Sequence, residues 1–133
     1  MDRTLRISRS ALAAIRVEAD AADDEICGLL LGAAITEARA CRNVHGHPAR
    51  HFEIDPAALL AAHRAARAGG PAVIGHYHSH PSGDPRPSPA DAADAPPDGA
   101  IWLIVGEGDM AAWIAVRDGM VHGRFDPVAI APV

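Results

Sequence analysis

The 133-residue sequence contains no lysine, because all 12 of its basic residues are arginine. The chain therefore has no side-chain amine to which another protein could be joined through an isopeptide bond. Aromatic residues are also scarce, at 4% of the sequence. Alanine, leucine, isoleucine and valine must then build the core, and a hydrophobic content of 49% is enough for one core. We expect a single domain over residues 1–133.

Three further absences exclude classes of protein. No stretch approaches the roughly 18 consecutive apolar residues of a membrane-spanning helix. The N-terminal segment, which carries Arg3, Arg6 and Arg9, lacks the apolar region of a signal peptide. The formal net charge of -5 provides no basic excess for binding nucleic acid. These features favour a cytoplasmic protein that binds neither membrane nor nucleic acid.

Hydrophobic periodicity and turn residues predict an α/β (α+β) domain with a mixed β-sheet flanked by helices. The Asp55-Pro56 pair is typical of a helix start, with Asp as the cap and Pro in the first turn, and Gly69-Gly70-Pro71 ends that helix. The other predicted helices are residues 10–22 and a short one after Ser88. The predicted strands are residues 4–7, 25–32, 35–44, 50–54, 71–77, 101–105, 110–117 and 120–125.

A His-x-His pair is the most informative feature of the sequence. His78 and His80 follow the apolar segment 71–77, which has the composition of a buried strand, so their side chains project from one face. Two imidazoles placed in this way can share one ion, and a catalytic zinc takes three protein ligands and leaves its fourth position to water. His76 lies on the same face but about 13 Å from His80. We expect His76 to be a packing residue or a support for the ligands.

Asp91 is the natural third ligand. Ser88 is a favourable N-cap and Pro89 suits the first helical position, which places Asp91 in the first turn of a helix, where it can face the strand. The same pair has a purely structural explanation, in which Ser88 bonds a backbone amide and Asp91 complements the helix dipole. The two explanations are compatible, because a hydroxyl oxygen accepts a hydrogen bond while its proton donates another.

Glu25 is the best candidate for the carboxylate that accepts a proton from the attacking water. It opens the apolar run Glu25–Gly32, which we expect to be a buried strand. The alternative is a solvated residue at the start of that strand. Cys27 has the same strand parity as Glu25, so it is either an inert core residue or part of a pocket lining. Cys27 and Cys41 form no CxxC pair, and we expect both thiols to be reduced.

Together these residues resemble the signature of the JAMM (MPN+) metalloprotease family, in its small prokaryotic branch. The matching elements are Glu25 before a Cys-Gly-Leu-Leu-Leu-Gly run, His78-x-His80, a gap of seven residues, Ser88, a gap of two and Asp91. The similarity covers nearly the whole chain, since Asn43 and Phe52-Glu53-Ile54-Asp55-Pro56 also look like the family's small bacterial members.

This resemblance implies an MPN/JAMM-like (cytidine-deaminase-like) fold and one zinc ion held by His78, His80 and Asp91. It implies that Glu25 is the acid and base acting through water, and that Ser88 stabilises the oxyanion. Family members cleave peptide or isopeptide bonds after the C-terminal glycines of ubiquitin-like proteins, and the bacterial members are associated with small sulfur carriers of ubiquitin fold. The expected substrate is therefore such a carrier protein. A homodimer is left open.

Other readings of the residues remain at this point. His45, His47 and His51 form a competing cluster that could bind a second metal, although we expect a solvated turn without an accompanying base or oxyanion donor. Two other functions compete with the peptidase. One is a zinc hydrolase or deaminase of a small molecule, although the Pro-Cys-x-x-Cys ligand motif of zinc deaminases is missing. The other is a non-catalytic binding module, which the full set of ligands plus Glu25 disfavours.

Overall fold

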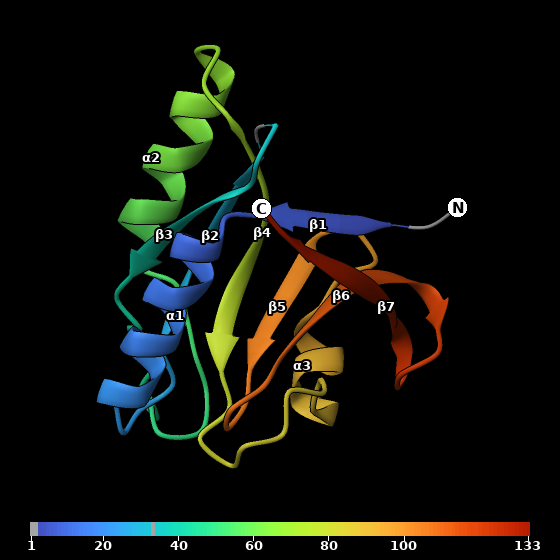
Figure 1. Cartoon of the computed structure of the whole chain (residues 1–133). Helices are drawn as coiled ribbons and strands as arrows, with labels where there is room; N and C mark the ends of the chain where they lie inside the picture. Colours follow the sequence, from blue (N-terminus) through green and yellow to red (C-terminus); the bar gives the residue numbers. More distant parts are fainter. Residues whose placement is uncertain (1–2, 33) are drawn as a thin grey trace.

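The computed structural model describes residues 3–32 and 34–133, and that part of the chain forms seven strands and three helices (Figure 1). Residues 1, 2 and 33 lie outside this description. The strands are β1 (Thr4–Ile7), β2 (Cys27–Gly32), β3 (Glu37–Cys41), β4 (Ala72–Ser79), β5 (Ile101–Val105), β6 (Met110–Gly119) and β7 (Gly123–Pro132). The helices are α1 (Arg9–Ala21), α2 (Pro56–Arg67) and α3 (Pro89–Asp94).

All seven strands belong to one mixed sheet with the order β1-β7-β6-β5-β4-β2-β3. β4 runs parallel to β5 and β1 runs parallel to β7, while the other neighbours are antiparallel. The two edges of the sheet approach each other at one point, where Thr36 donates its backbone N–H to the carbonyl of Arg6 at 2.7 Å. The sheet is therefore curved enough to bring its two edges, at β1 and beside β3, together.

Helices cover both faces of this sheet. Alternate residues along each strand point in opposite directions, so each face carries apolar side chains on which a helix can pack. On one face, Leu30, Tyr77 and Leu103 pack with Ile15 of α1. On the other face, the neighbouring positions pack against α2 and α3: Leu29 and Leu31 contact Ala62, and Trp102 and Ile104 share a core that Ala92 joins. His76 and His78 have the parity of the second face, which places them on the side of α2 and α3.

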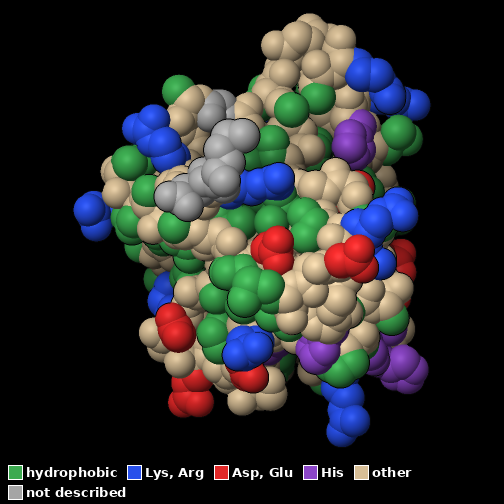
Figure 2. All heavy atoms as spheres, turned by 90° about the vertical axis from the view of Figure 1, so that its right-hand side faces the viewer, with side chains coloured by type: hydrophobic (Ala, Val, Ile, Leu, Met, Phe, Trp, Pro, Cys, Tyr) green, Lys and Arg blue, Asp and Glu red, His purple; other side chains and the backbone are tan. Residues whose placement is uncertain are grey.

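The crossover from β4 to β5 positions the site. Parallel strands cannot be joined by a tight turn, and here the connection contains α3. The carboxyl ends of β4 and β5 therefore lie together, at the bottom of the view in Figure 1, with α3 beside them. Acidic and basic side chains are interspersed over the face shown in Figure 2. Within the described residues, no helix combines the length and apolarity needed to cross a membrane.

Several predictions from local sequence are confirmed. Residues 4–7 and 101–105 are strands. Asp55 caps α2 by accepting the backbone N–H of Ala57 at 3.1 Å, and Pro56 is the first helical residue. The mixed sheet flanked by helices is also as expected.

The strand predicted for residues 50–54 was wrong. Residues 48–50 form a turn, and only Ile54 makes an isolated bridge, with Asn43. The Asn43 side chain accepts the backbone N–H of Glu53 and donates to the carbonyl of His51, so it takes the place of a strand partner. The strand predicted for residues 35–44 shortens at both ends to β3, because Thr36 makes only an isolated bridge with Ile7 and residues 42–44 belong to this loop.

The last predicted strand, residues 120–125, was also displaced. Residues 120–122 belong to a turn with His122 at φ 51°, and β7 continues from Gly123 to Pro132. Pro127 lies opposite Trp113 of β6, but its nitrogen points to the β1 side, as the Ala129 N–H does in bonding Arg3. It is tolerated because the pairing with β1 begins only at Ala129, so no partner requires an N–H there.

Candidate active site

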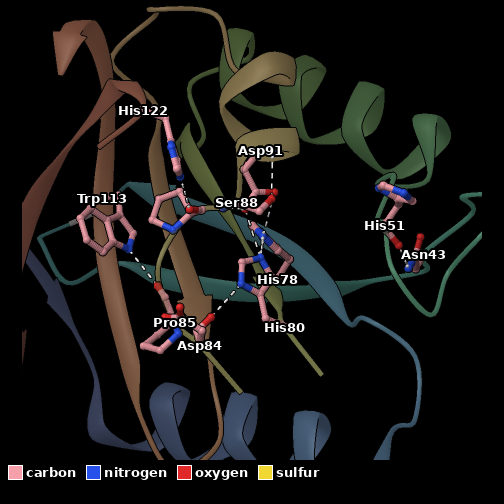
Figure 3. A network of polar contacts seen from close by, with 11 residues as sticks. Asn43, His51, His78, His80, Asp84, Pro85, Ser88, Asp91, Trp113 and His122 are labelled. Atoms are coloured by element: carbon pink, nitrogen blue, oxygen red, sulfur yellow. Dashed lines mark hydrogen bonds and ion pairs between the residues drawn. The ribbon is translucent and has the colours of Figure 1, made fainter. Parts of the chain in front are cut away.

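The structure brings all five predicted site residues to the carboxyl end of β4. His78 is the second-last residue of β4, and His80 follows its end. Ser88 and Asp91 come from the start of α3. Glu25 lies two residues before β2, so the predicted strand begins at Cys27 rather than at Glu25. Figure 3 shows His78, His80 and Asp91 pointing toward one another.

The side chains of His78, His80 and Asp91 form a compact set of donor atoms. The Nε2 atoms of the two histidines lie 3.1 Å apart. One oxygen of Asp91 lies 3.1 Å from His80 Nε2 and the other lies 3.5 Å from His78 Nε2. Two imidazole nitrogens and a carboxylate that face a common point suit zinc. Glu25 is a neighbour of this set, since its carboxylate and the ring nitrogens of His78 and His80 all lie within 4.8 Å of one another.

The pKa values of the three side chains reflect this packing. Burial alone would raise the pKa of Asp91, but hydrogen bonds from His78 and His80 hold it well below its ordinary value. Burial lowers the pKa of His78. Burial also acts to lower the pKa of His80, but its hydrogen bonds with Asp91 and with the Asp84 carbonyl outweigh that effect and raise it. The site therefore keeps one ionised carboxylate against one neutral and one more basic imidazole.

The loop between His80 and Ser88 is held by its carbonyl groups (Figure 3). His80 Nδ1 donates to the Asp84 carbonyl at 2.8 Å. This leaves the lone pair of His80 Nε2 to bind a metal. Trp113 donates its indole N–H to the carbonyl of Pro85 at 3.1 Å. His122 Nε2 donates to the carbonyl of Pro87 at 3.0 Å. Two side chains far away in sequence thus fix the segment that connects His80 to α3.

His78 is held by aromatic packing instead. The ring of Phe52 stacks on it with centroids 4.1 Å apart and an interplanar angle of 17°. Trp102 approaches His78 edge-on at 5.7 Å. Nδ1 of His78 is buried and has no hydrogen-bond partner among the described residues. His76 packs against Trp102 at 4.3 Å, and burial lowers its pKa to about 3, as expected for a packing residue.

Glu25 is buried at the edge of the pocket, with 6% of its surface exposed. Burial raises the pKa of its carboxyl from 4.5 to about 7; the charge of His80 opposes this shift and that of Asp91 adds to it. Both sides of its backbone are held: its N–H donates to the carbonyl of Pro48 at 2.8 Å, and its carbonyl accepts from Asn43 Nδ2 at 2.9 Å. The alternative hypothesis, in which Glu25 is a solvated residue at the start of a strand, is therefore wrong.

Ser88 caps α3 as predicted. Its Oγ accepts the backbone N–H of Asp91 at 3.1 Å, and its own backbone N–H donates to Asp91 Oδ2 at 2.9 Å. This is a reciprocal capping box. The cap leaves the hydroxyl proton of Ser88 available to a second acceptor. Asp91 Oδ2 thus contacts both the cap and His80, so the start of α3 and the histidine pair are mechanically connected.

A pocket of about 500 Å³ joins these residues. Glu25, His80, Ser88 and Asp91 form part of its wall, and the other residues lining it include His45, Arg50, His51 and Phe52. The histidine cluster lies in a turn with His47 and His51 exposed, as predicted, but the expectation that no base or oxyanion donor accompanies it was wrong. Residues 43–53 fold back on Glu25, and this long-range contact brings His45 and His51 into the pocket. His47 is exposed and stays outside the lining.

Phe52, Trp113 and His122 were missed as supporting residues by reasoning from motifs. The scarcity of aromatics was a usable signal, because the sequence has only two Trp, one Tyr and two Phe. Four of these five, namely Phe52, Trp102, Trp113 and Phe125, pack together on the site's face of the sheet. Nothing local in the sequence marked His122.

Cys27 does not line the pocket. It is fully buried, and burial raises the pKa of its thiol to about 12, which makes it an inert core residue at neutral pH. Cys27 and Cys41 are both free thiols, as expected, although Cys41 is only half-buried.

Comparison with known proteins gives a consistent result. Residues 8–116 match the family model described as prokaryotic homologs of the JAB domain. Two curated relatives named desampylase are each 36% identical. The one from Haloferax volcanii matches over 84 residues, 60% of this chain and 60% of the relative. The one from Pyrococcus furiosus matches over 114 residues, 84% of this chain and 81% of the relative.

A third relative, a probable TtuB-protein conjugate cleaving protease from Thermus thermophilus, is 43% identical over 53 residues, 40% of this chain and 36% of that protein. Two of these three matches therefore span less than two thirds of the relative. The solution structure of a protein from Desulfitobacterium hafniense superimposes with a TM-score of 0.78 at 24% identity, covering 98% of this chain and 92% of that one. This last similarity establishes the fold alone.

Proposed function

Since the chain belongs to the family of prokaryotic homologs of the JAB domain, we propose that it is a zinc-dependent peptidase acting on conjugates of a ubiquitin-like protein. It would cleave peptide or isopeptide bonds directly after the C-terminal Gly-Gly of a carrier of the sulfur-carrier type. JAB-domain proteins are zinc-dependent in general. The observation that carries the proposal is the convergence of two imidazoles and a carboxylate beside Glu25, at the wall of a pocket that Glu25, His80 and Asp91 line.

His78, His80 and Asp91 are the proposed ligands of one zinc ion. Their donor atoms already face one another at 3.1–3.5 Å, and the Asp84 carbonyl fixes the ring of His80 with Nε2 toward that point. Glu25 is the competing third ligand, because its carboxylate also lies near both histidines. Asp91 is favoured because it contacts both rings directly. Zinc supplies the Lewis acidity that activates water and polarises the scissile carbonyl.

Glu25 is the proposed proton acceptor and donor. A carboxyl whose pKa lies at about 7 can take a proton from water at neutral pH and return it to the leaving amine. The two backbone hydrogen bonds of Glu25 hold it at the pocket wall while it does so. Ser88, which lines the same pocket, would donate its hydroxyl proton to the developing oxyanion.

The pocket also supports a peptide substrate. An extended tail must pass between the loop that carries His51 and the start of α3, and residues without side chains approach the reacting centre most easily. A Gly-Gly terminus meets this condition. The names of the relatives add support, since one of them denotes a protease that cleaves protein conjugates.

The test is hydrolysis of defined adducts. Small ubiquitin-fold carriers with a peptide or a lysine-linked extension after Gly-Gly are incubated with the zinc-loaded protein, and the products are identified by mass spectrometry. We expect cleavage directly after Gly-Gly and a loss of rate on the order of a hundredfold when either glycine becomes valine. Equal rates for glycine and valine tails would refute the proposal. Turnover of small molecules such as cytidine without cleavage of any carrier would support the small-molecule hydrolase instead.

A further inference from the structure

The loop of residues 43–53, which joins β3 to the start of α2, contacts both halves of the proposed machinery. Part of it lines the pocket, through His45, Arg50, His51 and Phe52. The same loop reaches Glu25 through Asn43 and Pro48. It reaches His78 through Phe52. The loop therefore contacts both the proposed base and a proposed zinc ligand.

Asn43 uses every hydrogen-bonding position of its side chain. Its Nδ2 donates to the carbonyl of Glu25 and to the carbonyl of His51, both at 2.9 Å. Its Oδ1 accepts the backbone N–H of His45 at 3.1 Å and that of Glu53 at 3.0 Å. An amide has two protons and two lone pairs, so this set is complete and fixes which way the amide faces. Figure 3 shows Asn43 beside His51, within the loop.

Glu25 depends on this loop because it has no strand partner of its own. It precedes β2, and its backbone N–H and carbonyl are bonded to Pro48 and to Asn43 respectively. Both partners belong to the same loop. The following residues are bonded to the histidine strand instead: Ile26 exchanges hydrogen bonds with Ser79, and Cys27 pairs with His78. Loop 43–53 therefore holds both backbone polar groups of Glu25 itself, and so contributes to the position of its carboxylate beside His78 and His80.

Phe52 gives His78 a support that hydrogen bonding does not provide. A metal-binding histidine commonly donates its second ring N–H to a carbonyl or a carboxylate, as His80 does to Asp84. The second ring nitrogen of His78 has no such partner among the described residues. The stacked ring of Phe52, with Trp102 edge-on, restricts the rotation of the imidazole in its place.

We propose that loop 43–53 positions the site through two separate contacts, with Asn43 as the positioning residue for Glu25 and Phe52 as the positioning residue for His78. The proposal rests on the proposed function, in which Glu25 is the base and His78 a zinc ligand. It distinguishes the two contacts by their effects. Loss of the Asn43 contact impairs turnover with zinc retained, whereas loss of the Phe52 contact weakens zinc binding.

Asn43→Asp tests the first contact. The substitution replaces Nδ2 by oxygen, so both donated hydrogen bonds are lost while the accepting oxygen is kept. We expect the turnover number of the zinc-loaded protein to fall on the order of tenfold to a hundredfold, because a displacement of a reacting group by about 1 Å can cost that much. KM and zinc affinity should change by less than about threefold. The amide proton of Glu25 should exchange faster, whereas that of Leu103 in β5 should not.

Phe52→Leu tests the second contact, because it keeps an apolar side chain but removes the flat ring. We expect zinc affinity, measured by competition with a chelator, to fall roughly tenfold or more. Turnover should recover at saturating zinc. Phe52→Tyr retains the flat ring and should bind zinc like the parent. If only the volume of the side chain mattered, the added hydroxyl would also change zinc affinity.

Asp98→Ala is the matched control, since it removes an exposed carboxylate that accepts the backbone N–H of Ala100, outside the pocket. It should leave turnover and zinc affinity unchanged. If Asn43→Asp does not fold, Asn43→Ala takes its place, because it removes the same two donors without adding charge. Parental turnover and parental Glu25 exchange in the variant would overturn the role of Asn43. Parental zinc affinity in Phe52→Leu would overturn the role of Phe52.

The parent protein separates this proposal from the proposed function. A parent that binds zinc but cleaves no Gly-Gly adduct refutes the peptidase, while the zinc titration and the exchange of the Glu25 amide still decide between positioning and no positioning. A parent that cleaves the adduct, with variants that behave like it in every measurement, refutes the positioning roles alone.

Discussion

Replacing Glu25 by glutamine separates the proton acceptor from the metal ligands. The amide has nearly the shape of the carboxyl group but cannot accept the proton of the attacking water, so we expect Glu25→Gln to lose roughly a hundredfold to ten-thousandfold in turnover. Zinc should remain bound, because the proposed ligands are untouched. The backbone hydrogen bonds to Pro48 and Asn43 do not involve the side chain and should hold the segment in place.

The same substitution has a calculable effect on the stability of the metal-free protein. The pKa of Glu25 rises from 4.5 to about 7 on folding, because burial penalises the charged form. Below pH 4.5 the carboxyl is protonated in both states and contributes nothing to pH dependence. Above pH 7 it is ionised in both, and the folded state then bears a cost of about 3 kcal/mol. The free energy of unfolding of the parent should therefore fall by about this amount, relative to Glu25→Gln, as the pH rises through that window.

Chemical denaturation of both proteins at pH 4 and pH 8, after removal of metal, measures this difference, and groups that titrate alike in both proteins cancel. A parent and a variant with parallel pH profiles would show that the carboxyl is not destabilised by burial. Loss of zinc in Glu25→Gln would make Glu25 a ligand, in the arrangement with His78 and His80 that the structure also permits. Full turnover with zinc bound would require a different base.

Four other substitutions, with His63→Ala as a control, test the site and the fold. His78→Ala and Asp91→Ala should each lose the single zinc ion expected per parent chain, whereas the exposed His63→Ala should keep it, and elemental analysis that finds full zinc in the first two variants would move the site elsewhere. Ser88→Ala should cost about 1 kcal/mol of stability as a lost cap; if Ser88 is also the oxyanion donor, turnover per folded molecule should fall by a further factor on the order of a hundred, and intact turnover would leave it a cap alone. Gly75→Ala should destabilise the protein by several kcal/mol in thermal unfolding, because a Cβ there meets the backbone carbonyl of Ile101 in the parallel strand, and an unchanged midpoint would contradict the β4–β5 register.

The candidate site could be predicted in large part because its residues are encoded locally. The alternation of His78 and His80 at the end of an apolar strand determines that their side chains share a face. The Ser88-Pro89 start determines that Asp91 lies in a first helical turn, and the structure shows the corresponding capping box. Spacing of this kind depends on backbone geometry over a few residues, so it survives without knowledge of the rest of the fold.

The surroundings of those residues were decided by contacts between distant segments. A strand was predicted inside loop 43–53 from the alternation of its side chains. That alternation does not reveal that the Asn43 amide bonds the loop to Glu25, 18 positions earlier in the chain. Trp113 and His122 hold the carbonyls of Pro85 and Pro87 across 28 and 35 positions. Such contacts depend on which strands pair and where the sheet curves, and only the folded chain specifies both. The identities of the candidate site residues could therefore be predicted from the sequence. The segments that hold them in place were determined by the tertiary structure.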